Sequence, residues 1–325
     1  MKTNFNTRRQ SIKLILTLFL LLIYFTGNAQ LKGGHILGAM GLQSGTQAPA
    51  KTLSVYVPGY LYDACSLRNA NGDKSVANPD ITMFITGAGA SYISDFKILG
   101  ANYGASILLA FASNTIQGNS LDAKNSLAFT DMFVQPVQLG WHNKRADFVF
   151  SYQIYLPTGK FTAGASDNAG LGMFMNEFSA GTTLFFNDKK TFHFSALAAY
   201  EINGKKKDTD IKTGDILSIE GGLGKTFYLM NAEKTAPKGI LNAGAIYYLQ
   251  GKISPDKIPV GNSVLEPAKD RIAGIGAEVN YFHIGSKTSA GLRWVSEFEA
   301  VNRFQGNTFF LTLAHVFSLA KVVEE

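Results

Sequence analysis

The chain has 325 residues, 46% of them hydrophobic, 12% aromatic and 17% charged, and its formal net charge at pH 7 is +6. Four basic residues before position 25 carry most of this charge and leave about +2 on the remainder, so the basic balance does not indicate a nucleic-acid partner. Cys65 is the single cysteine, which excludes an intrachain disulfide and a metal site built from cysteines.

Residues 1–29 are predicted to be a signal peptide. A basic region (Lys2, Arg8, Arg9 and Lys13) precedes an apolar run over 14–25, and the small residues Gly27-Asn28-Ala29 fit cleavage before Gln30. An uncleaved anchor is the disfavoured alternative, because a membrane helix needs roughly 20 apolar residues. No cysteine follows the run to carry a lipoprotein anchor. We therefore expect an exported chain.

Residues 30–52 are rich in glycine and show no clear period. They predict either a flexible lead-in or a segment in the mouth of the domain that follows. In the second case, residues 34–50 would constrict the pore.

The rest of the chain alternates apolar and polar residues with a period of two. Between 147 and 156, for example, Phe148, Phe150 and Ile154 share one face, while Ser151 and Gln153 share the other. This pattern is typical of strands with one oily and one wet face. Twelve strands are predicted, at 53–63, 82–94, 97–112, 129–142, 147–156, 175–186, 192–201, 215–228, 239–252, 271–283, 288–301 and 308–319.

The predicted links alternate between short turns and longer loops, as in transmembrane barrels with periplasmic turns and external loops. We expect an all-β, up-and-down antiparallel transmembrane β-barrel over 53–319, followed by a tail at 320–325. Ten to fourteen strands remain open. Pro58 predicts a bulge in the first strand, Pro136 is awkward in the fourth, and 113–127 is predicted to be a loop.

Eight polar or charged residues fall on the wet faces and are candidate pore-lining residues. Facing lipid would cost a basic residue about 2–4 kcal/mol near the bilayer midplane. Two interpretations stay open: a structural network in which Arg293 braces neighbouring carboxylates, or a weakly acidic lining that disfavours anions. The candidates are Glu177, His193, Glu201, Glu220, Glu278, Arg293, Glu297 and Glu299.

No sequence motif indicates catalysis, a metal or a cofactor. The five histidines (His35, His142, His193, His283 and His315) stand singly, without the spacing of a zinc site, and are interpreted as incidental. Neither a Gly-x-Ser-x-Gly elbow nor a P-loop is present. The basic run over 205–207 predicts a solvated loop, with contact to lipopolysaccharide as the alternative.

Three short motifs occur in a familiar order: Gly33-Gly34-His35 followed by further glycines, Tyr60-Leu61-Tyr62 before Asn71-Gly72-Asp73, and Leu156-Pro157-Thr158-Gly159. Together they resemble the outer-membrane family named for the meta-pathway of phenol degradation. The resemblance implies a barrel that passes small hydrophobic or aromatic compounds, with a role similar to that of the long-chain fatty-acid channels. It implies no catalytic or ligand residues.

We therefore predict a non-enzymatic channel in a Gram-negative outer membrane for passive uptake of such compounds, without a cofactor. A structural or adhesive barrel is the alternative, and a barrel hydrolase ranks lowest. The expected partners are outer-membrane lipid, the solute and the barrel-assembly machinery, and not nucleic acid.

Overall fold

The computed structural model describes residues 33–75, 79–118, 123–261 and 263–318. This part of the chain consists of an irregular segment up to Lys51 and, after it, strands with their connecting turns and loops. No helical segment within it has both the length and the apolar character that crossing a membrane demands.

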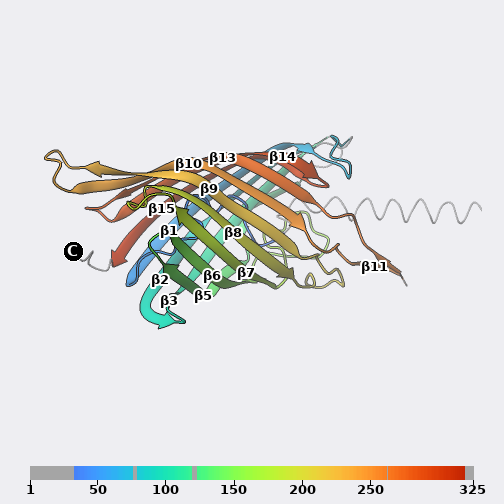
Figure 1. The fold of residues 1–325 in the computed structure, drawn as a ribbon. Coiled ribbons are helices and arrows are strands. Elements are labelled where there is room, and N and C mark those ends of the chain that lie inside the picture. Colours follow the sequence, from blue (N-terminus) through green and yellow to red (C-terminus); the bar gives the residue numbers. More distant parts are fainter. Residues whose placement is uncertain (1–32, 76–78, 119–122, 262, 319–325) are drawn as a thin grey trace, which may run out of the picture.

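The strands form one antiparallel sheet that closes on itself (Figure 1). The neighbours around the ring are β1, β15, β14, β13, β10, β9, β8, β7, β6, β5, β3 and β2, and β2 pairs again with β1. β5 pairs with the first half of β3, and β4 pairs with its second half. β11 and β12 form a separate hairpin. The bounds are β1 Thr52–Leu67, β2 Asp80–Ile98, β3 Ala101–Gln117, β4 Ala123–Phe129, β5 Met132–His142, β6 Ala146–Leu156, β7 Met175–Phe185, β8 Phe192–Asn203, β9 Ile216–Met230, β10 Pro237–Lys252, β11 Ile258–Val260, β12 Ser263–Leu265, β13 Arg271–His283, β14 Thr288–Val301 and β15 Phe304–Ser318.

The two faces of the wall are inverted relative to a water-soluble protein. On β7, Glu177, Ser179 and Thr183 are buried, whereas Phe178 and Leu184 are exposed. Large apolar side chains are exposed along most other strands as well. Burying the polar face and exposing the apolar one fits a strand that faces lipid outside and a polar lumen inside. The predicted fold class, an all-β transmembrane barrel with a ring of twelve strands, is confirmed.

Loop length also sorts by end. The short connections at 99–100, 143–145, 186–191, 231–236 and 284–287 share one end of the barrel with the start of β1 and the end of β15. Most connections at the other end are longer, notably 157–174 and 253–270, and the β11–β12 hairpin projects there (Figure 1). By the usual sorting of such barrels, the short-turn end faces the periplasm.

Two local predictions were wrong. Pro58 causes no bulge: the β1–β2 ladder runs from Tyr56 opposite Gly89 to Gly59 opposite Thr86 in unchanged register. Within the described β1–β2 ladder Val57 and Pro58 have no partner, and Pro58, which has no N–H to donate, lies opposite Thr312 in the β1–β15 ladder. The predicted loop at 113–127 is also partly strand, because β3 continues to Gln117 and β4 begins at Ala123. The expected fourth strand is therefore broken between β4 and β5.

Residues 33–51, here called the lead-in, run through the inside of the barrel. Gly34 lies against the Tyr155 ring of β6, Gly41 against Glu278 of β13, and Gly45 against the backbone of Thr182 on β7. These strands lie on different sides of the ring, so the segment crosses the lumen. It descends from the long-loop half to the short-turn end, where it joins β1.

Gly45 is a position at which only glycine fits. A methyl group added there would lie 2.1 Å from the backbone carbonyl carbon of Thr182, which belongs to the rigid wall. We expect Gly45→Ala to displace the lead-in and to speed amide hydrogen exchange over 33–47 about tenfold, since overpacking costs about 1–3 kcal/mol. Gly59→Ala is the matched control, because its added methyl would lie 3.9 Å from Leu311 Cβ. Equal exchange in the two variants would contradict the close packing.

Candidate functional site

Three carboxylates lie together on the inner wall, in the long-loop half of the barrel. Glu177 on β7, Glu201 on β8 and Glu220 on β9 come from adjacent strands, and Glu177 is directly opposite Glu201 in the register. Their exposed fractions are 0%, 1% and 0%. Buried like charges at such spacing repel, so the fold must supply donors or cations to hold them there.

The lead-in supplies these donors from its backbone. The N–H groups of Gly34 and His35 donate to Glu201 Oε2 at 2.7 and 2.9 Å. Those of Gly38 and Met40 donate to Glu220 Oε1 and Oε2 at 3.1 and 3.0 Å. The glycine-rich segment therefore binds the wall through its main chain, and its small residues permit the close approach.

The His35 imidazole bridges two of the carboxylates. Its Nδ1 lies 2.9 Å from Glu177 Oε1 and its Nε2 lies 3.0 Å from Glu220 Oε1. An ionised carboxylate only accepts hydrogen bonds, and an imidazole donates from both nitrogens only when it is protonated. The geometry therefore fits an imidazolium, whose charge offsets that of the two glutamates. Glu177 also accepts from Tyr155 Oη at 3.0 Å and from the Gln153 side-chain amide.

A second contact group lies farther along the lead-in. Arg293 on β14 and Glu278 on β13 are opposite each other in the register, with Arg293 Nε 3.0 Å from Glu278 Oε2. The same oxygen accepts the Leu42 N–H at 2.7 Å. The Arg293 guanidinium also lies 5.5 Å from the centre of the Phe310 ring. Arg293 thus pairs with one carboxylate across the strands and helps to position the lead-in.

Glu297 has a separate set of partners. It accepts from the hydroxyls of Tyr62 and Tyr248 and from the Gly306 N–H, each at 2.8 Å. Its side chain is buried on the inner face of β14. Three neutral donors from three strands hold this carboxylate within the wall.

The remaining two candidates take no part in these contacts. His193 is buried beside the Phe185 ring, with a centroid separation of 6.3 Å, and its ring nitrogens have no hydrogen-bond partner among the described residues. Glu299 is exposed, contrary to prediction. Its φ of 56° and the register shift opposite β13 mark a bulge, which turns Ala300 inward in its place.

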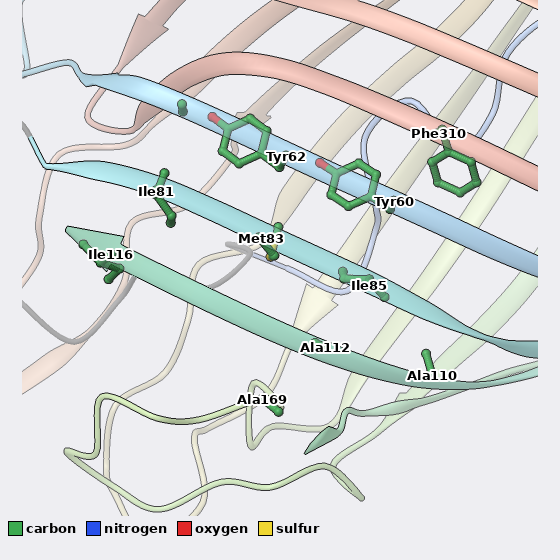
Figure 2. Packing of buried hydrophobic residues seen from close by; sticks show 11 residues of the cluster. Tyr60, Tyr62, Ile81, Met83, Ile85, Ala110, Ala112, Ile116, Ala169 and Phe310 are labelled. Carbon is green, nitrogen blue, oxygen red and sulfur yellow. The ribbon is translucent and has the colours of Figure 1, made fainter. Parts of the chain in front are cut away.

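Between the lead-in and the wall lies a cavity of about 350 Å³. Apolar and aromatic side chains of β1, β2, β5 and β15 form much of its lining, including Tyr60, Met83, Ile85, Phe133 and Phe310. Figure 2 shows how Tyr60 and Phe310 approach the inward side chains of β2 and β3. Within the described chain, no group of three or more His, Cys, Asp or Glu residues is arranged to hold a metal ion.

The sequence did not predict the contacts that His35 makes in the lumen, and this histidine was interpreted as incidental. Its partners lie 142 and 185 residues away in the chain. The one signal present was the glycine-rich context, since exposed main-chain N–H groups beside an imidazole suit carboxylate partners.

A family model described as "Putative MetA-pathway of phenol degradation" matches residues 64–313. The chain belongs to this family. The match covers the barrel from the end of β1 to β15, so it takes in all the wall residues of the site except those of β1 before Ala64, such as Tyr60 and Tyr62. The lead-in lies outside the matched range.

Two solved structures have a similar fold. An outer membrane channel from Pseudomonas putida F1 is 11% identical, with a TM-score of 0.64, over 87% of this chain and 100% of that chain. The transport unit of the autotransporter AIDA-I from Escherichia coli is also 11% identical, with a TM-score of 0.52, over 93% and 97%. At this identity the likeness shows the fold alone. Among curated proteins, none matches the sequence.

Proposed function

We propose that the protein is an outer-membrane channel for the passive uptake of small hydrophobic or aromatic compounds. The observation that carries the proposal is the apolar cavity inside the lumen. A lumen that serves only as a structural support has no need of a cavity lined by aromatic and aliphatic side chains, whereas a route for apolar solutes does. The description of the family and the channel from Pseudomonas putida support the same conclusion.

Facilitated diffusion through such a barrel needs neither a cofactor nor an energy source. The solute would leave the external side, occupy the cavity beside the lead-in and continue towards the periplasmic end. Its affinity has to be modest, because a solute that binds too tightly would not leave.

The pore-lining carboxylates serve in this proposal chiefly to hold the lead-in. Glu220 faces the His35 ring and Glu278 faces Arg293, so each has a basic partner. We therefore expect the cation preference inferred from the acidic lining to be small.

Flux into liposomes tests the channel. Proteoliposomes should take up an uncharged aromatic such as benzyl alcohol faster than glucose, when each rate is expressed relative to that of protein-free liposomes. An oxidation assay inside the liposomes measures the uptake of benzyl alcohol, and a swelling assay measures that of glucose. Bulky replacement of the cavity wall by Ala110→Phe and Ala112→Phe should lower the aromatic flux severalfold, since both residues line the cavity. Val149→Phe, also inward but outside the cavity lining, is the control. Aromatic uptake equal to that of protein-free liposomes would refute the channel.

A further inference from the structure

The connection between β6 and β7, residues 157–174 and here called the β6–β7 loop, folds back into the barrel. Its tip is exposed, whereas residues 168–173 are buried. Ala169 and Leu171 in this buried arm line the apolar cavity. Figure 2 shows Ala169 near Ala112 on the inner face of β3, within one cluster of buried side chains. The loop therefore forms part of the enclosure of the cavity.

The buried arm lies at the external edge of the cavity. β3 runs outwards to Gln117, and Asn114 is the last of its residues to line the cavity. The Nδ2 of Asn114 donates to the main-chain carbonyl of Asn168 in the loop at 3.4 Å. The loop thus crosses the inner face of β3 between the cavity and the long-loop end of the barrel. A solute that enters along this face has to displace the loop.

A single carboxylate holds both arms of the β6–β7 loop. Asp131 lies in the break between β4 and β5. Its Oδ1 accepts the Gly159 N–H at 3.1 Å, and its Oδ2 accepts the Leu171 N–H at 2.7 Å. Hydrogen bonds to an ionised acceptor are roughly twice as strong as those between neutral groups. Beside them, the Thr130 hydroxyl donates to the Ala169 carbonyl at 2.7 Å.

Two glycines let the loop approach this break closely. A methyl group added at Gly159 would lie 2.7 Å from the carbonyl carbon of Thr130, and one added at Gly170 would lie 2.6 Å from Asp131 Oδ1. The loop is thus held by hydrogen bonds from single residues and not by pairing within the sheet. It can leave its seat while every strand of the ring stays paired, which is the kind of local opening that costs less than global unfolding.

We propose that the β6–β7 loop is a gate between the external solution and the apolar cavity, and that Asp131 is the positioning residue that holds it closed. The inference rests on the proposed function and adds the step that controls it. A solute enters the cavity when the loop leaves Asp131, and return of the loop closes the cavity behind it.

Thiol labelling in lipid nanodiscs tests the gate. Ala112→Cys in a Cys65→Ser background places a thiol in the cavity, and Val149→Cys in the same background places one on the inner face of β6 outside the cavity lining. Asp131→Ala removes two charge-assisted hydrogen bonds and should raise the rate of maleimide labelling about tenfold at position 112. At position 149 the rate should change less than twofold.

Two further variants separate the role of Asp131 from a general loss of an acid. Asp131→Asn keeps one accepting oxygen, so labelling at position 112 should be intermediate. Asp167→Ala is the matched control, because Asp167 belongs to the same loop but pairs with Lys160 where both side chains are exposed. It should leave both labelling rates unchanged. The shift in electrophoretic mobility on heating checks that each variant is folded.

Equal labelling of position 112 in Asp131→Ala and Asp167→Ala would overturn the gate. Faster labelling at both positions would also overturn it, because the barrel as a whole would then have loosened. Proteoliposomes with Asp131→Ala should take up benzyl alcohol severalfold faster than the wild type, and equal uptake would show that the loop does not limit entry. Selective labelling without uptake by either protein would instead refute the proposed channel, while the movement of the loop would stand.

Discussion

Deleting residues 33–47 is expected to raise the single-channel conductance severalfold. The lead-in crosses the lumen and contacts β6, β7, β8, β9 and β13, so it occupies space that ions would otherwise use. The barrel should survive the deletion, because its strands pair with one another around the ring and none pairs with the lead-in. Conductance in planar bilayers measures the effect, with the signal peptide fused ahead of residue 48.

The fold of the deletion variant is checked by the shift in electrophoretic mobility on heating that folded barrels display. The matched comparison keeps the length of the segment but replaces residues 33–47 with a glycine-serine sequence. This version should conduct more than the wild type and fluctuate more, because it has lost His35 and the packed side chains. A deletion variant that folds and conducts like the wild type would show that another part of the chain sets the constriction.

The second large effect is expected for Glu220→Ala, which should release the lead-in while the barrel stays folded. Glu220 receives the His35 ring and the N–H groups of Gly38 and Met40. Removing one partner of a buried, hydrogen-bonded charge pair costs about 3–5 kcal/mol. Because every 1.4 kcal/mol is a factor of ten, the released state should become at least 100-fold more populated.

Thiol labelling measures this population. Met40→Cys in a Cys65→Ser background places a single thiol on the lead-in, and a membrane-impermeant maleimide reports how often it becomes accessible. Glu299→Ala is the control, since that glutamate is exposed and lies outside the network. Labelling of the Glu220→Ala protein at the control rate would mean that the carboxylate does not hold the segment.

The wall of the barrel was predictable because its signal is local. Two-residue alternation needs only neighbouring side chains, and the predicted strands at 271–283 and 288–301 match β13 and β14 at both ends. The prediction failed where the backbone departs from regular pleating. A bulge at Glu299 reverses which residues of β14 point into the lumen, and no residue type in that stretch predicts a bulge. The break between β4 and β5 is likewise set by pairing with β3.

The site was only half predictable, for a different reason. Lipid excludes charge, so Glu177, Glu201 and Glu220 had to point inward wherever their strands lay. Their partners are main-chain N–H groups and one histidine from a segment without periodicity, and apart from the glycine-rich composition of that segment the sequence does not indicate main-chain donors. The apolar cavity depends on side chains from five or more separate segments, which only the closed ring brings together.

The lead-in is covalently joined to the wall where β1 begins at Thr52. A lead-in that dissociates from its carboxylates therefore remains tethered near them. Its rebinding is intramolecular and first-order, so dilution does not slow it. Short flexible linkers give effective concentrations on the order of millimolar. Each molecule thus contains its own blocking segment. The fraction of time that the lead-in spends dissociated from the wall should be the same in a crowded membrane as in a single reconstituted channel.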